Sequence, residues 1–146
     1  MKKIALFAVL LVGILFLHSC APTLGPVYQK VDTIPENLGL VVIYRPSSFI
    51  GAAVSYDVKV GETPIFRLYN EGYYPYFSKP GEVEFWAKTE SRSAVTLDIR
   101  AGQTYYIKGT VGIGFLVGRP HLMVVPEDVA EKEISKCKLC PEKTEQ

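Results

Sequence analysis

The sequence predicts a mainly β domain: an antiparallel β-sandwich or partly closed barrel of about seven to nine strands, with one C-terminal α-helix. Between residues 39 and 125, apolar and polar residues alternate in short runs, the period-2 pattern of half-buried strands. Glycine, proline or asparagine separates these runs about every ten residues, as in sandwiches and barrels. Only the segment after residue 126 has the apolar spacing of a helix.

The first strands follow one another as expected hairpins. Residues 39–45 are a β-branched run, which Pro46 ends. Residues 54–60 alternate valine and tyrosine with polar residues, so one face of this strand should be buried. Further strands are expected at 64–68 and 73–77, and a glycine-containing turn precedes each of them.

The second half of the domain repeats this alternation. Strands are expected at residues 83–88, 95–99, 103–111 and 122–125. Three glycines, at positions 112, 114 and 118, interrupt the apolar sequence before the last strand. Glycine within a strand pattern indicates a bulge or a close approach of the backbone.

The helix should begin after Pro126, because proline is tolerated in a first helical turn and two acidic residues follow it. Ala130, Ile134 and Cys137 have the i, i+4, i+7 spacing of one helical face. We expect this helix to cover the β domain. The polar residues 141–146 are expected to be a disordered tail.

The N-terminus has the pattern of a signal peptide. Lys2 and Lys3 precede an apolar stretch at residues 4–17. As a helix, this stretch would cover roughly 21 Å, which is short of the roughly 30 Å hydrocarbon core of a bilayer. Removal of residues 1–19 is therefore favoured over a retained membrane anchor, and an ordinary secretory signal is the other alternative.

The end of this leader, Leu17-His18-Ser19-Cys20, resembles the bacterial lipobox. His18 departs from the pattern because it is bulkier and more polar than the usual residue at its position. The resemblance implies that Cys20 is acylated and becomes the mature N-terminus. Ala21 replaces the aspartate that retains such proteins in the inner membrane, so we expect outer-membrane sorting, with the domain facing the periplasm.

The remaining chain is expected to form a single domain. Residues 20–38 contain three prolines and read as a lipidated tether, and residues 39–140 as the β-sandwich with its helix. The leader removes two of the 16 basic residues and none of the 15 acidic ones, which leaves a mature net charge near −1. Basic residues are scattered singly, which argues against a nucleic-acid partner.

Cys137 and Cys140 form a CxxC pair near the C-terminus. In an oxidising envelope compartment, a structural disulfide is the favoured interpretation. Free thiols, a redox site and a metal site are the alternatives. A redox site needs a thioredoxin-like βαβ pattern, and a zinc site needs a second pair of ligands.

Catalytic groups are scarce in the mature sequence. His121 is its only histidine and stands at the start of an apolar strand, where an edge or surface position explains it equally well. We therefore expect no catalytic residue, no metal and no cofactor. The alternative is a small redox or hydrolytic enzyme that uses the CxxC pair or His121.

Aromatic residues give the better indication of binding. Tyr73, Tyr74, Tyr76 and Phe77 crowd one short strand, whose alternate side chains must point to opposite faces. If Tyr74 and Tyr76 point outward, they could form a binding patch with Trp86 for an envelope protein or a glycan. Burial of the same residues over a sheet or under the helix is the alternative.

Residues from about 39 to 139 resemble the bacterial family called domain of unknown function 2846. The stretches that carry the resemblance are Tyr44-Arg45-Pro46-Ser47-Ser48, Lys79-Pro80-Gly81, Ala87-Lys88-Thr89-Glu90, Ala101-Gly102-Gln103-Thr104-Tyr105-Tyr106, Gly118-Arg119-Pro120 and Cys137-Lys138-Leu139. The resemblance implies a compact β domain of exported bacterial proteins, often lipoproteins, and no activity. The sequence thus predicts a lipid-anchored, non-enzymatic binding or scaffolding protein.

Overall fold

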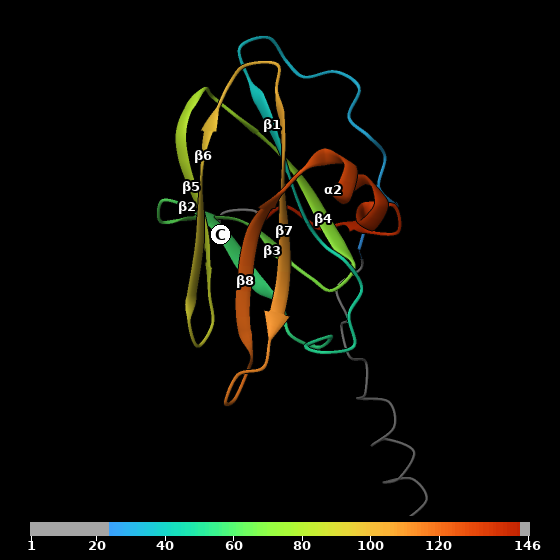
Figure 1. Ribbon diagram of the computed structural model, residues 1–146, viewed down its shortest axis with the longest axis vertical. Coiled ribbons are helices and arrows are strands. Elements are labelled where there is room, and N and C mark those ends of the chain that lie inside the picture. Colours follow the sequence, from blue (N-terminus) through green and yellow to red (C-terminus); the bar gives the residue numbers. More distant parts are fainter. Residues whose placement is uncertain (1–23, 144–146) are drawn as a thin grey trace, which may run out of the picture.

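The computed structural model describes residues 24–143 and shows a β-sandwich of two facing sheets with one helix (Figure 1). The elements are β1 (Gly39–Arg45), β2 (Tyr56–Val60), β3 (Thr63–Leu68), β4 (Gly72–Ser78), β5 (Gly81–Lys88), β6 (Arg92–Ile99), β7 (Thr104–Gly112), β8 (Arg119–Val125), α2 (Glu127–Ile134) and β9 (Lys138–Leu139). The predicted mainly β fold is confirmed. The predicted leader, the lipobox and Cys20 lie outside the described residues.

The two sheets differ in strand direction. The four-stranded sheet has the order β3-β2-β5-β6 and is antiparallel throughout. The five-stranded sheet has the order β8-β7-β1-β4-β9 and is mixed, because β1 runs parallel to β7 and β4 parallel to β9. The expected all-antiparallel arrangement therefore holds for one sheet only.

The main core lies between the sheets. Val41 and Ile43 of β1 point into it, where they meet Val58, Phe66 and Phe85 of the opposite sheet. The intervening residues of β1 point to the outer face of the five-stranded sheet, which is also covered. All seven residues of β1 are buried as a result, and this explains its unbroken apolar sequence.

The outer face of the five-stranded sheet carries a second core beneath α2. Ala130 and Ile134 of the helix pack there on Leu40, Val42 and the neighbouring aromatic residues of the sheet. The helix therefore covers the β domain as predicted. It ends at Ile134, so Cys137 is not part of the helix, although it is buried in the same cluster.

The segment before β1 packs on the domain from residue 24 onward, whereas the sequence suggested a tether through residue 38. The Gly25 amide donates to the Leu139 carbonyl at 2.7 Å, and the Tyr28 amide donates to the Cys137 carbonyl at 2.8 Å. The Tyr28 ring also meets the ring of Tyr73 edge-on, with 5.1 Å between centroids. Any tether must therefore end before Leu24.

The C-terminal segment also packs against the sandwich over its described part. Glu142 forms a bridge with Phe66, and the Lys143 amide donates to the Ile65 carbonyl. The expectation of a disordered tail is thus wrong for residues 141–143. Within residues 24–143, the helix α2 is not long and apolar enough to cross a bilayer.

Candidate functional site

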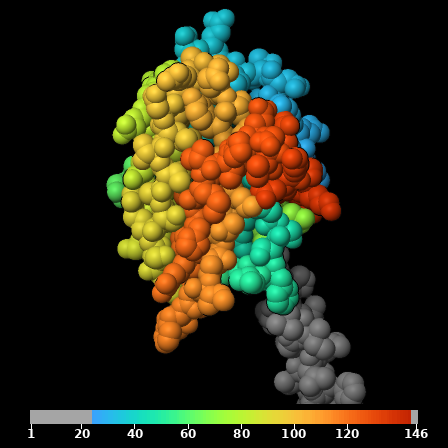
Figure 2. Space-filling model, viewed as in Figure 1, coloured from blue at the N-terminus to red at the C-terminus, as the bar shows by residue number. Residues whose placement is uncertain are grey.

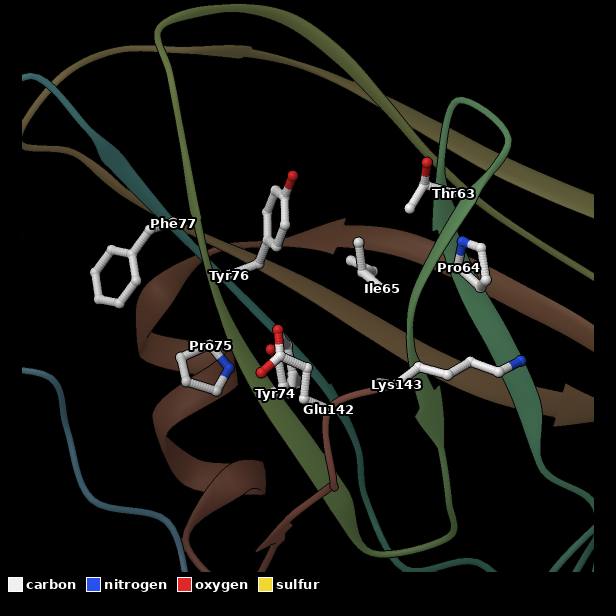
Figure 3. A pocket seen from close by; sticks show the side chains of 9 residues that line it. All are labelled: Thr63, Pro64, Ile65, Tyr74, Pro75, Tyr76, Phe77, Glu142 and Lys143. Carbon is white, nitrogen blue, oxygen red and sulfur yellow. The ribbon is translucent and has the colours of Figure 1, made fainter. Parts of the chain in front are cut away.

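A cleft of about 670 Å³ opens along the side of the sandwich between β3 and β4 (Figure 3). β3 belongs to the four-stranded sheet and β4 to the five-stranded sheet, so the cleft lies at an edge where the two sheets separate. Its lining is aromatic and apolar, with one carboxylate and one amine on its rim: Thr63, Pro64, Ile65, Tyr74, Pro75, Tyr76, Phe77, Glu142 and Lys143. Such a lining suits a ligand with both apolar and hydrogen-bonding groups.

The cleft exists because β9 is short. β9 pairs only with Gly72 and Tyr73, so the rest of the outer edge of β4 has no neighbouring strand among the described residues. The Tyr73 carbonyl accepts from the Cys140 amide at this edge, and in an antiparallel pair every second residue turns its backbone the same way. Pro75 and Phe77 therefore direct their backbone groups outward.

Pro75 changes what this edge can bind. Proline has no amide hydrogen, and the register opposite Val42 places its nitrogen on the outer side, where β1 needs no donor. The open edge consequently offers the Pro75 carbonyl together with the amide and carbonyl of Phe77. Proline at an edge is a common device against unwanted strand pairing, so this edge is partly protected.

Tyr74 and Tyr76 line the cleft from the inner face of β4. The Tyr74 ring stacks on Phe66, with 4.6 Å between centroids, and the Tyr76 ring meets Phe85 edge-on at 5.7 Å. Figure 3 shows Tyr76 and Ile65 facing each other between the two strands, with Phe77 on the opposite side of β4. Burial raises the pKa of the Tyr74 hydroxyl, and the nearby Glu142 carboxylate raises it further.

The predicted patch of Tyr74, Tyr76 and Trp86 does not form. Trp86 follows the core residue Phe85 in β5, so its side chain points to the outer face of the four-stranded sheet. There the indole lies between Lys59 and Arg92, at 4.8 and 4.9 Å from the ring centroid, and its Nε1 donates to the Gly61 carbonyl at 2.6 Å.

Cys137 and Cys140 are free thiols in the structure, contrary to the disulfide prediction. The two residues of β9 separate them, so strand alternation turns the two thiols to opposite faces of the five-stranded sheet. Cys137 lies in the cluster beneath α2 and Cys140 in the core between the sheets. Burial raises the pKa of Cys137 to about 12 and that of Cys140 to about 11.

His121 lies exposed on β8, opposite Thr110 of β7. In the part of the chain that the structure describes, histidine, cysteine and acidic side chains do not gather in groups of three that could hold a metal ion. The sequence left open an enzymatic alternative that uses either the CxxC pair or His121. In the structure both thiols are buried, whereas the imidazole lies at the surface.

Arg45 is a structurally important residue that the sequence analysis did not single out. Its side chain is buried, and its two terminal nitrogens donate to the carbonyls of Val54 and Gly51 at 2.6 and 2.7 Å. Among the described residues its Nε atom has no hydrogen-bond partner, and Arg45 forms no salt bridge with a carboxylate. The Arg45 side chain therefore binds the backbone of the loop between β1 and β2.

Glu90 binds the backbone of the loop between β7 and β8, as Arg45 binds that of the loop between β1 and β2. Its carboxylate accepts from the backbone amides of Phe115, Leu116 and Val117, at 2.8 Å for Phe115 and 2.6 Å for Val117. These three amides lower the pKa of Glu90. In the sequence Glu90 is one acidic residue in a polar turn, with nothing to connect it to a loop 25 residues further on.

Comparison with known proteins identifies one related family. A family model described as "Protein of unknown function (DUF2846)" matches residues 35–118, which include β1 to β7 and the loop that Glu90 holds. The strand walls of the cleft lie within the match, whereas β8, α2, β9 and the C-terminal rim of the cleft lie beyond it. No curated protein and no solved structure matches the chain.

Proposed function

We propose, from the premise that the chain belongs to the DUF2846 family of proteins of unknown function, that it is a lipid-anchored binding module of the bacterial cell envelope. Its ligand is a polypeptide segment in extended conformation, held in the cleft between β3 and β4. The domain binds without catalysing a reaction. The family supplies no activity to transfer, so the proposal depends on the geometry of the cleft and on the leader sequence.

The observation that carries this proposal is the tyrosine-lined cleft beside an open strand edge. An extended segment could hydrogen-bond to the backbone of Phe77 and to the Pro75 carbonyl, as in other cases of strand addition. Its side chains would meet the rings of Tyr74 and Tyr76, which packing against the core holds in place. Rigid aromatic rings give contact area at a small cost in conformational entropy.

A non-enzymatic function is supported by the state of the groups that could react. Reactive cysteines have a lowered pKa, whereas burial raises the pKa of both Cys137 and Cys140. His121 lies on the surface of β8, apart from the cleft lining. A redox or hydrolytic activity therefore has less support than binding.

Peptide selection tests the binding proposal. A library of random ten-residue peptides is selected against the full chain, and the affinity of the selected peptides is measured by fluorescence polarisation. We expect Tyr76→Ala to weaken binding by about tenfold or more, as for a central aromatic contact. The matched control, Trp86→Ala, removes an aromatic ring from the outer face of the other sheet and should leave the affinity unchanged.

Peptides that bind wild type and Tyr76→Ala equally well would show that the cleft is not their site. Selective binding of envelope oligosaccharides, with no peptide enriched, would show that the ligand is a glycan. In both cases the polypeptide proposal is wrong.

The lipid anchor has its own test. In cells, the intact mature protein should carry acyl chains on Cys20, which mass spectrometry of the N-terminal peptide detects. The protein should be found in outer-membrane fractions, and Cys20→Ser should release it or leave its leader uncleaved. A wild-type protein with an unmodified Cys20 would contradict the anchoring.

A further inference from the structure

One end of the sandwich is covered by exposed apolar side chains from two loops. Among the described residues, ten large apolar side chains are exposed, and six of them belong to these loops. Phe49 is exposed to 98% and Phe115 to 90%. The six are Phe49 and Ile50 from the loop between β1 and β2, and Ile113, Phe115, Leu116 and Val117 from the loop between β7 and β8. We call this set the apolar end.

The two loops lie side by side. β1 and β7 are adjacent parallel strands, so the chain leaves both at the same end of the sheet. The backbone of the first loop approaches β7 so closely that a Cβ on Gly51 would lie 2.6 Å from Val111. A Cβ on Gly118 of the second loop would lie 2.8 Å from the same side chain. Figure 2 shows both loops, teal and orange, at the lower end of the molecule.

Charged groups hold the backbones of both loops while the apolar side chains point outward. Glu90 accepts from three consecutive amides of the second loop, and Arg45 donates to two carbonyls of the first. The loops themselves, residues 46–55 and 111–118, contain no charged residue. Amides that are already bonded need no water, which lowers the cost of placing them in an apolar medium.

The chain enters the domain at this same end. The Gly25 amide donates to the Leu139 carbonyl, Leu139 pairs with Tyr73, and Tyr73 pairs with Tyr44, the last residue but one of β1. Cys20 lies four residues before Leu24, the first described residue. Four residues span at most about 14 Å when fully extended. A lipid on Cys20 would therefore hold this end of the sandwich close to the bilayer.

We infer that the apolar end inserts into the surface of the bilayer in which the Cys20 lipid is anchored. This inference rests on the proposed anchoring at Cys20. The loops form a second membrane contact beside the lipid, and two contacts fix the orientation of the domain where one lipid alone leaves it free to rotate. Phe115, Leu116 and Phe49 supply aromatic and aliphatic groups of the kind that enter the boundary between headgroups and acyl chains.

A fluorescence experiment tests the insertion on the full mature chain reconstituted into phospholipid vesicles. Trp86 is the only tryptophan, so it is replaced by phenylalanine and a reporter is introduced by Phe115→Trp. The matched control carries Trp86→Phe with Phe77→Trp, which places the reporter at the opposite end of β4. The vesicles contain phosphatidylcholine brominated near the headgroup end of its acyl chains, which quenches tryptophan only on contact.

We expect several-fold stronger quenching of the Phe115→Trp reporter than of the Phe77→Trp control. Equal or absent quenching of both reporters in a chain that carries its lipid would overturn the insertion and leave the anchoring intact. An unmodified Cys20 together with unquenched reporters would overturn both proposals. A dimer in sedimentation analysis that Phe115→Ser dissociates would show that a second copy, not the bilayer, covers the apolar end.

Discussion

Two charged side chains, Arg45 and Glu90, each hold one apolar loop by its backbone. Arg45 binds two carbonyl oxygens and has no carboxylate partner, whereas Glu90 binds three backbone amides and also lies 3.9 Å from the Arg119 guanidinium. Burying an arginine without a carboxylate is costly, and the two carbonyl contacts offset part of that cost. At the scale of single residues, the shape of the apolar end depends on these two.

Glu90→Gln should loosen the loop between β7 and β8. A carboxylate accepts several amides with its two oxygens, whereas the glutamine amide group offers one oxygen and turns an NH₂ towards the remaining donors. Amide hydrogen exchange at residues 115–117 should therefore become faster, while the rest of the domain is unchanged. Glu84→Gln is the matched control, because Glu84 pairs with Arg92 on the sheet surface. Equal exchange in wild type and Glu90→Gln would contradict this role.

The two thiols should resist alkylation in the folded protein. Burial raises the pKa of Cys137 to about 12 and of Cys140 to about 11, so both are protonated at pH 8 and shielded from reagents. Labelling with iodoacetamide, followed by mass spectrometry, should proceed only as fast as the protein unfolds and be rapid in denaturant. Rapid labelling of one cysteine under native conditions would indicate an open, reactive site.

At the scale of elements, α2 is tied to the five-stranded sheet through Glu133. Its carboxylate accepts from the Tyr44 hydroxyl at 2.7 Å and from Lys108 at 2.6 Å. Burial alone would raise the pKa of Glu133, but these two partners outweigh burial and lower it. The ionised form of Glu133 is therefore favoured in the folded protein.

This lowered pKa predicts a pH dependence of stability. A carboxyl group whose pKa is lower in the folded state contributes stability above its unfolded pKa, near 4.3, and loses it as the pH falls through the folded value. Glu133→Gln should reduce the free energy of unfolding by about 1 kcal/mol at pH 7, after allowance for solvent screening. The difference from wild type should shrink below pH 4, as measured by urea unfolding. The exposed Glu82→Gln is the control.

Strands could be predicted from the sequence more fully than their pairing. β1 has the predicted bounds because its β-branched run and Pro46 mark both ends. The parallel pairing of β1 with β7 joins residues more than 60 positions apart, and local alternation contains no information about such partners. The cleft was missed for the same reason, since it depends on β9 having only two residues. Trp86 could be placed outward, but Tyr74 and Tyr76 could not be assigned to a face.

At the scale of the whole molecule, apolar side chains have two distinct roles. Phe85 is fully buried between the sheets, whereas Phe115 is exposed at the apolar end. The sandwich is held together by the first kind, because burial of apolar area is the main favourable term in folding. Exposed apolar side chains such as Phe115 contribute little to folding, and an interaction with another surface is needed to account for them.

The same substitution at both positions should separate these roles. Phe85→Ala leaves a cavity in the core and should lower the free energy of unfolding by about 3–5 kcal/mol. Phe115→Ala should change it by less than about 0.5 kcal/mol, as for most surface positions. Chemical denaturation followed by circular dichroism measures both. A large loss of stability with Phe115→Ala would show that the loop is part of the fold's core.

β4 connects the two surfaces on which the proposals depend. It starts at Gly72, where the chain enters and the apolar end lies, and continues to Tyr76 in the cleft. Four residues of strand at about 3.4 Å each separate these points by roughly 14 Å. If the apolar end rests on the membrane, β4 sets the distance between the membrane surface and the cleft. A partner attached elsewhere in the envelope would then bind only if its segment can extend to that distance, in addition to having a suitable sequence.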